Sequence, residues 1–200
     1  MNNFPSGQYG LIYCDPPWSY KMWGDDTGYE KSPDKHYSCM SHDDLLGMRD
    51  NVLFATAPDA VCFMWAVWPM LDQAQALMKA WGFTYKTGGA WHKRSKLWTP
   101  DCEEPKSAFG TGYIFRSASE PFLIGTVGDP KTNNKSTRNI IEAAVREHSR
   151  KPDCVYDMIE GLFDGAYLEL FARNERPNWA SWGNETGKYS NQIIGGEVCI

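Results

Sequence analysis

The sequence predicts an α/β domain built on a largely parallel β-sheet. Segments with the apolar character of buried strands alternate along the chain with segments of helical spacing, as in folds whose helices cover a parallel sheet. The 200 residues are enough to bury one hydrophobic core. Because no repeat or linker interrupts this pattern, we expect a single domain over residues 1–185. A flexible tail rich in Gly, Ser and Asn is expected over residues 186–200.

Short apolar runs bounded by turn-forming residues predict the strands. The first run ends at Asp15-Pro16-Pro17, which stops it as a strand. The expected strands cover residues 9–14, 60–65, 83–91 and 166–171, and two further β-rich segments cover residues 113–115 and 121–127.

Three helices are expected, each with an identifiable start or end. Ser41 N-caps the first helix, which runs to Met48. The second covers residues 69–81 and ends at Gly82. The third begins at Pro152, since proline is favoured in the first helical turn. The polar segments between these elements are expected to be loops, at residues 19–37, 92–109 and 131–138.

Charge is unevenly distributed along the chain. The formal net charge of −5 argues against a protein that binds polyanions through net charge alone. Residues 1–60 contain four basic and nine acidic side chains, whereas residues 131–151 contain six basic and two acidic ones. The second segment is either a basic surface for a nucleic acid or an ordinary solvated surface. The nine Trp residues leave a similar choice between core packing and stacking on flat rings.

The cysteines and the hydropathy pattern predict a cytoplasmic protein with reduced thiols. The six cysteines form no C-x-x-C pair, and the sequence has neither a signal peptide nor an apolar run that could span a bilayer. Cys39 and His42 have the spacing of a metal-ligand pair, but no second pair accompanies them. We therefore expect no metal site and no membrane association.

The tetrapeptide Asp15-Pro16-Pro17-Trp18 directly follows the first predicted strand. In α/β proteins, loops at the carboxyl ends of parallel strands line the ligand-binding crevice. An exocyclic amine on an aromatic ring is a poor nucleophile, and a carboxylate such as Asp15 together with a backbone carbonyl can accept both of its N–H bonds. The prolines stiffen the turn and remove amide donors, and Trp18 offers a flat ring on which a base can stack. The tetrapeptide therefore suits the activation of an aromatic amine, although a simple strand-ending turn has the same residues.

Further motifs follow the tetrapeptide in order along the chain: Lys35-His36-Tyr37, Lys151-Pro152-Asp153, Glu169-Leu170-Phe171-Ala172-Arg173, Pro177-Asn178-Trp179 and Trp182-Gly183-Asn184-Glu185. In this order they resemble the motifs of the MT-A70 family of S-adenosylmethionine-dependent adenine-N6 methyltransferases, from about Tyr9 to Glu185. The resemblance implies a Rossmann-like methyltransferase fold with permuted motif order, in which the catalytic motif precedes the cofactor motif. One departure from generic methyltransferases is that Phe171-Ala172-Arg173 stands where those enzymes have a glycine-rich loop.

The resemblance also implies roles for individual residues. The catalytic residues would be Asp15, Pro16, Pro17, Trp18 and Tyr37. S-adenosylmethionine would be bound by Asp15, Lys151, Glu169, Arg173, Asn184 and Glu185. The substrate would be contacted by Trp18, Tyr37 and Glu120. The residues themselves add Lys93, Arg94 and Lys96 to the substrate contacts. The segment 92–98 combines these cations with an aromatic ring at each end, His92 and Trp98, which suits a strand-tracking loop or a solvated one.

The expected reaction is methylation of the N6 amino group of adenine in DNA, by a monomer or a homodimer. The family contains RNA and DNA enzymes, and its compact members resemble the branch that acts on DNA; RNA stays open as the alternative. The target adenine has to leave its stack to reach Asp15. Two other readings stay open: methylation of cytosine N4, and a catalytically weak homologue that only binds nucleic acid.

Overall fold

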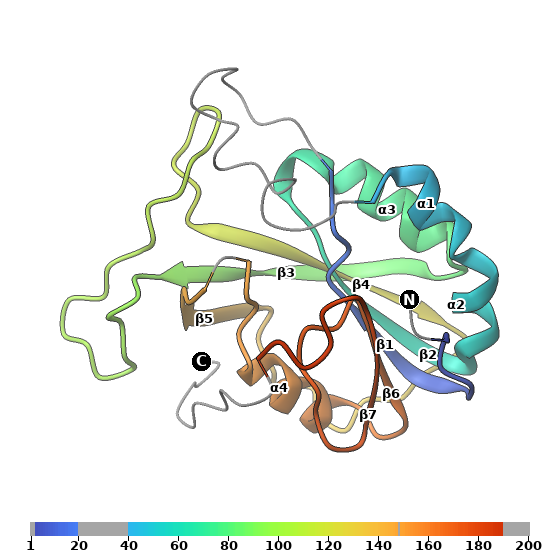
Figure 1. Ribbon diagram of the computed structural model, residues 1–200. Helices are drawn as coiled ribbons and strands as arrows, with labels where there is room; N and C mark the ends of the chain where they lie inside the picture. The colour runs from blue at the N-terminus through green and yellow to red at the C-terminus, as the bar shows by residue number, and fades with distance from the viewer. Residues whose placement is uncertain (1–2, 20–39, 148, 190–200) are drawn as a thin grey trace. The chain divides into compact units, whose positions relative to one another are not determined.

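A computed structural model describes residues 3–19, 40–147 and 149–189 (Figure 1). These residues divide into two compact units. Unit 1 contains the described residues up to Thr87, Leu123–Pro130, and the described residues from Gly165 onward; unit 2 contains Gly88–Phe122 and Lys131–Asp164. The strands β3 (Thr84–Arg94) and β4 (Ser119–Val127) contribute residues to both units.

Seven strands form one mostly parallel sheet, in the order β5-β3-β4-β2-β1-β6-β7. β1 (Tyr9–Cys14) is parallel to both of its neighbours, β2 (Thr56–Trp65) and β6 (Tyr167–Leu170). β7 (Trp179–Trp182) is parallel to β6, and β5 (Ile140–Ala144) is parallel to β3. The predicted α/β class with a largely parallel sheet is confirmed, and the architecture agrees with a Rossmann-like methyltransferase fold.

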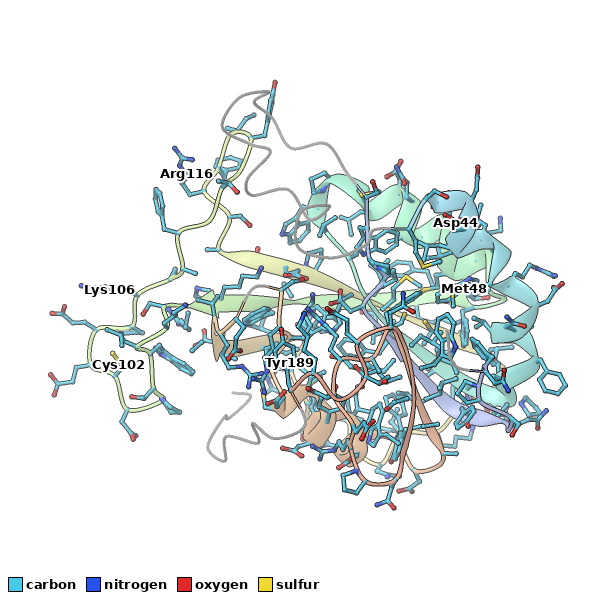
Figure 2. All side chains as sticks on the ribbon, in the orientation of Figure 1. Asp44, Met48, Cys102, Lys106, Arg116 and Tyr189 are labelled. Atoms are coloured by element: carbon cyan, nitrogen blue, oxygen red, sulfur yellow. The ribbon has the colours of Figure 1, made fainter. Side chains whose placement is uncertain are left out.

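The helices of unit 1 are α1 (His42–Gly47), α2 (Arg49–Ala55), the 3-10 helix η3 (Trp68–Met70) and α3 (Leu71–Ala80). Figure 1 shows α1, α2 and α3 together on one side of this unit, and Figure 2 marks Asp44 and Met48 in this region. The predicted cap is confirmed as a capping box, because Ser41 Oγ accepts from the Asp44 amide while the Asp44 carboxylate accepts from the Ser41 amide. Unit 2 contains α4 (Cys154–Leu162), close to its predicted start.

Buried tryptophans account for most of the unusual tryptophan content. Trp18, Trp65, Trp81, Trp91, Trp179 and Trp182 are all at least nine-tenths buried. The indole N–H of Trp81 donates to the Leu45 carbonyl at 3.0 Å, and that of Trp91 donates to the Ala143 carbonyl at 2.9 Å. A buried indole needs such a partner, so these rings are fixed packing elements rather than exposed stacking surfaces.

Several boundaries differ from the prediction. The helix expected over residues 69–81 is divided between η3 and α3, and β3 continues to Arg94 instead of ending at Trp91. The helix α2 and the strands β5 and β7 were not predicted. The sequence of β5, Ile-Ile-Glu-Ala-Ala, has no strand signature after its first two residues, and its pairing with β3 outweighs the weak local preference.

The β-rich segment predicted at residues 113–115 is wrong. These residues form a bend, and an isolated bridge between Gly110 and Ser117 closes a turn around them. Apolar and aromatic character therefore marks an exposed turn here, not a buried strand.

The expectation of reduced thiols is wrong at Cys154, which is disulfide-bonded. Cys14, Cys62 and Cys102 are free thiols. Among the helices of the described residues, none has the length and apolar character needed to cross a bilayer.

Candidate active site

The predicted catalytic turn lies at the carboxyl end of β1. In the sheet register, Cys14 at the end of β1 pairs with Met64 of β2 and with Leu170 of β6. Because all three strands run in the same direction, Asp15 emerges at the same sheet edge as Trp65 and Phe171. This is the edge at which open α/β sheets bind ligands.

The backbone of the turn is hydrogen-bonded at both prolines. The Trp18 amide donates to the Pro16 carbonyl at 2.8 Å, and the Met40 amide donates to the Pro17 carbonyl at 3.1 Å. Each of these carbonyls therefore already accepts one N–H. Because a carbonyl oxygen has two lone pairs, each retains the capacity to accept a second one.

The Asp15 carboxylate forms an ion pair with Arg173. Nη2 of Arg173 lies 3.0 Å from Oδ2 of Asp15, and their side chains are 17% and 20% exposed. The two residues are 158 positions apart in the sequence and meet because β1 and β6 are adjacent. Two residues predicted for catalysis and cofactor binding are thus in direct contact.

A left-handed residue aims Arg173 at this pair. Phe171, which directly follows β6, has φ +61°, a conformation that costs a non-glycine residue free energy. The next residue, Ala172, donates its amide to the Trp182 carbonyl at 3.0 Å, and the Arg173 carbonyl accepts from the Tyr189 amide at 3.2 Å. A sharp turn, fixed by these two backbone hydrogen bonds, therefore stands where other methyltransferases have a glycine-rich loop.

Trp18 is buried in the core of unit 1. Only 4% of its surface is exposed, and its indole N–H donates to the Trp65 carbonyl at 3.2 Å. In this conformation the ring offers a base very little surface. The stacking role stays a prediction, and it requires the ring to become more exposed when substrate binds.

Glu169 is a buried carboxylate in β6, at 8% exposure, and it pairs in register with Tyr13 of β1. Burial, followed by the negative charge of Glu169, raises the pKa of Tyr13 well above its ordinary value. The Tyr13 hydroxyl therefore stays protonated, and it accepts a hydrogen bond of 2.8 Å from the Trp65 indole. Beyond β7, Asn184 is exposed, and the Glu185 carboxylate lies 2.6 Å from Nζ of Lys188.

In unit 2, Glu120 of β4 bridges two lysines. Its Oε1 lies 2.8 Å from Nζ of Lys151, and its Oε2 lies 2.6 Å from Nζ of Lys93. The side chains of Glu120 and Lys151 are 12% and 8% exposed. Burial alone would raise the pKa of Glu120, but the charges of Lys151 and Lys93 outweigh it and lower that pKa to about 2. The Glu120 carboxyl is consequently charged at neutral pH.

The turn that carries Lys151 is held by a second ionic cluster. Arg146 donates to the Asp153 carboxylate and to the Lys151 carbonyl, both at 2.7 Å. The buried Arg150 donates to the same carboxylate at 2.9 Å. Burial opposes these contacts, but the two arginines still lower the pKa of Asp153. Much of the basic character of residues 131–151 is thus used internally.

A model of the MT-A70 family matches residues 9–185. The chain belongs to the MT-A70 family. The catalytic subunit METTL3 of the human N(6)-adenosine-methyltransferase is 27% identical over 183 residues, which cover 90% of this chain and 28% of that protein. A probable N(6)-adenosine-methyltransferase MT-A70-like of Oryza sativa subsp. japonica is 30% identical over 182 residues, which cover 90% of this chain and 23% of that protein. The type II methyltransferase M.MunI of Mycoplasma sp is 29% identical over 202 residues, covering 90% and 79%.

This membership identifies a family of N6-adenine methyltransferases that generally use S-adenosylmethionine. The chain spans about a quarter of the length of the N(6)-adenosine-methyltransferase relatives it matches. The structure brings several of the predicted site residues together in two groups. Asp15 pairs with Arg173 in unit 1, and Glu120 pairs with Lys93 and Lys151 in unit 2.

Other predicted residues are not part of these groups. Arg94 pairs with Glu142, with a shortest N–O distance of 2.9 Å, and its hydrogen bonds lower the pKa of Glu142. Lys96 is exposed in the segment after β3. Tyr37 lies outside the described residues. Within the parts of the chain that the structure describes, no group of three or more His, Cys, Asp or Glu side chains is placed to hold a metal ion.

Sequence reasoning missed the supporting residues of the MT-A70 site. Arg146 and Asp153 fix the Lys151 turn, and Glu142 neutralises Arg94. The motif Lys151-Pro152-Asp153 does point to Asp153, because a carboxylate directly before a helix is favoured there as an acceptor for the first-turn amides. Nothing in the local sequence indicates Glu142, whose partners come from a strand about 50 residues earlier.

Replacing Glu120 with Gln should destabilise the protein and change how its stability depends on pH. A carboxyl whose pKa falls to about 2 on folding stabilises the native state fully above its ordinary pKa of 4.5, and this stabilisation is lost as the pH falls from there toward 2. At pH 7 we expect Glu120→Gln to lower the free energy of unfolding by about 3 kcal/mol, because the buried Lys151 and the partly buried Lys93 lose their counter-charge.

Urea unfolding of wild type and variant at pH 7, 5 and 3.5 measures this difference. It should shrink toward pH 3.5. The exposed Glu104→Gln is the matched control, and it should leave stability unchanged. A loss for Glu120→Gln that is equal at all three pH values would mean that charge is not its cause.

Proposed function

We propose that this chain transfers a methyl group from S-adenosylmethionine to the N6 amino group of adenine in nucleic acid, with DNA as the preferred substrate. The observation that carries the proposal is the Asp15 carboxylate, presented at the carboxyl end of a central strand of an MT-A70 chain. A turn that only ended a strand would not require a charged side chain held by an arginine from a distant motif.

We assign to Asp15 the task of holding the target amine. A carboxylate accepts several hydrogen bonds, so Asp15 can accept one amine N–H while it keeps its contact with Arg173. The Pro16 carbonyl is the second acceptor that we assign, through its remaining lone pair. With both N–H groups engaged, the nitrogen lone pair is less delocalised into the ring and can attack.

The cofactor supplies an electrophilic methyl group on a sulfonium centre. The amine nitrogen that accepts this methyl group would become cationic, and its proton would become acidic. The Asp15 carboxylate stabilises that charge and can accept the proton. Arg173 acts as a positioning residue, since it fixes the orientation of one carboxylate oxygen. Correct orientation of reactants is worth roughly 7–11 kcal/mol of barrier.

The residues of this chain fit S-adenosylmethionine by their chemistry. Glu169 is a buried carboxylate near the end of β6, suited to accept from ribose hydroxyls, and Lys151 is a buried ammonium suited to a carboxylate. Because an ammonium has three donors, Lys151 can bind a ligand carboxylate without leaving Glu120. Arg173, Asn184 and Glu185 are assigned to the adenosine part of the cofactor.

The substrate residues are assigned in the same way. Trp18 and Tyr37 would hold the target base, Glu120 and Lys93 would contribute near it, and Arg94 and Lys96 would follow the strand. Lys93 and Arg94 are already paired with carboxylates, so their contribution to affinity should be smaller than that of the exposed Lys96.

The DNA assignment is supported by the type II methyltransferase M.MunI, of which the matched region covers 79%. RNA is the second candidate, and it is supported by the relatives named N(6)-adenosine-methyltransferase, because adenosine is a ribonucleoside. Methylation of cytosine N4 and binding without catalysis are further outcomes that the experiments below separate.

Asp15→Asn should reduce turnover by about 100-fold or more, because it removes the charge and places N–H donors where acceptors are needed. Transfer of a labelled methyl group from the cofactor measures this loss, and circular dichroism checks the fold. The exposed Asp50→Asn is the control and should retain full activity. Retention of a tenth or more of wild-type turnover by Asp15→Asn would remove Asp15 from the catalytic role.

Lys151→Ala should weaken binding of S-adenosylhomocysteine by about tenfold or more, which corresponds to one lost charge-assisted hydrogen bond. Titration calorimetry measures this affinity, and a filter-binding assay with the same protein should show a smaller change for nucleic acid. The exposed Lys135→Ala is the control from the same basic segment. An unchanged affinity of Lys151→Ala for the cofactor product would place Lys151 outside the cofactor site.

Matched DNA and RNA oligonucleotides, incubated at one salt concentration and digested for mass spectrometry of nucleosides, test the polymer and the base. We expect N6-methyladenine in DNA, formed fastest in single strands or easily opened sites, because extrusion of the base costs less there. If RNA is methylated about tenfold faster than either form of DNA, RNA replaces DNA in the proposal. N4-methylcytosine as the product would overturn the choice of base, and no product from any polymer would favour a binding protein.

A further inference from the structure

In unit 2, a long loop over residues 95–118, which we call the excursion, connects β3 and β4. Its base is closed by an antiparallel bridge between Arg94 and Ser107, and its outer part by a bridge between Gly110 and Ser117. The Gly110 amide donates to the Ser117 carbonyl at 2.9 Å. Figure 2 labels Cys102, Lys106 and Arg116 along this excursion.

The outer part of the excursion presents large apolar side chains to solvent. Four of them, which we call the tip cluster, lie within seven residues: Phe109, Tyr113, Ile114 and Phe115. Their exposed fractions are 81%, 74%, 78% and 84%. Single exposed apolar residues are ordinary, but a concentration of four at the end of a projecting loop marks a contact surface.

The backbone around the tip cluster forms a turn that depends on two glycines, Gly110 and Gly112. A Cβ atom on Gly112 would lie 1.9 Å from the Phe115 carbonyl oxygen, and one on Gly110 would lie 2.8 Å from the Ser117 carbonyl oxygen. Only glycine permits these close approaches, so the two glycines define a tight turn around residues 113–115. The turn carries Ile114 and Phe115 at its apex, away from any packing that would bury them.

Charge indicates the kind of partner. Residues 105–118 contain two basic side chains, Lys106 and Arg116, and no acidic one, whereas the acidic residues of the excursion, Asp101, Glu103 and Glu104, precede them. The Arg116 guanidinium lies over the Phe109 ring, 5.3 Å from its centroid. Cations beside apolar and aromatic side chains are a combination found in proteins that bind phosphates and insert side chains between bases.

We propose that the tip cluster is a wedge that inserts into duplex nucleic acid beside the target base. Ile114 and Phe115 would replace part of the base stacking, and Arg116 would bind a neighbouring phosphate. The inference rests on the proposed function, because it assumes a nucleic-acid substrate. It adds the means by which an adenine inside a duplex is released: the wedge unstacks the step next to it and so lowers the cost of extrusion.

The wedge is tested with the double variant Ile114→Ser, Phe115→Ser on matched single-stranded and duplex substrates. Methylation of the duplex should fall by about tenfold or more, while methylation of the single strand should stay within about twofold of wild type. Phe54→Ser is the control, since Phe54 is 74% exposed and lies in α2. It should change neither rate, and all variants should have the wild-type melting temperature because the substituted side chains are exposed.

A second measurement does not depend on turnover. A duplex with 2-aminopurine beside the target adenine should become fluorescent when wild type binds in the presence of S-adenosylhomocysteine, and this increase should be lost in the double variant. Arg116→Gln should weaken duplex binding and reduce the slope of log affinity against log salt by about one. An absence of methylation with an intact fluorescence increase would therefore refute the proposed reaction and leave the wedge standing.

Three results would overturn the wedge. The first is an equal loss of activity on single strands and duplexes, which would indicate a general substrate contact. The second is wild-type duplex activity and fluorescence in the double variant. The third is a wild-type protein that is dimeric by light scattering and becomes monomeric in the double variant, which would assign the tip cluster to a contact between two copies of the chain.

Discussion

The parallel placement of β1 between β2 and β6 is the constraint on which the predicted catalytic turn depends. Backbone hydrogen bonding fixes the three strands in register, so their carboxyl ends reach one edge of the sheet together. Asp15, Trp65 and Phe171 are neighbours for that reason alone, although they come from three distant parts of the chain. The ion pair between Asp15 and Arg173 follows from this register and from the left-handed backbone at Phe171, which directs the arginine back toward β1. A shift of one residue in either pairing would separate the two charges.

Compensation of buried charge is the second theme, and it takes several basic residues out of reach of a polyanion. Glu120 pairs with Lys93 and Lys151, Glu142 pairs with Arg94, and Asp153 pairs with Arg146 and Arg150. A charge that leaves water without such a partner costs several kcal/mol, so these pairs are conditions for folding as much as for binding. The charged groups inside the protein are thus paired, while Lys96, Lys106 and Arg116 are among the cations exposed to solvent.

The fold could be predicted where local chemistry decides it. The apolar run of β1 ends at two prolines, and Ser41 is a favoured N-cap, so the end of the strand and the start of α1 are predictable from adjacent residues. The strand β5 was missed because its residues favour no strand on their own, and the segment at 113–115 was misread because apolar residues at an exposed turn have the same composition as a strand. Motif order identified Asp15, Lys151 and Glu120, but their partners depend on strand pairing. No local pattern indicates that Arg173 lies against Asp15, or that one glutamate holds two lysines.

The burial of Trp18 has a consequence for the amino acids that its position can tolerate. The side chain there has to fill a large space in the core of unit 1, and it also has to supply a ring N–H for the carbonyl at the end of β2. Phenylalanine would fill much of the space and leave that carbonyl without its donor, while a smaller residue would leave a cavity beneath the catalytic turn. The last residue of the tetrapeptide is therefore constrained by the assembly of the domain itself. Selection for a correctly folded chain would preserve it even in a descendant that had ceased to methylate anything.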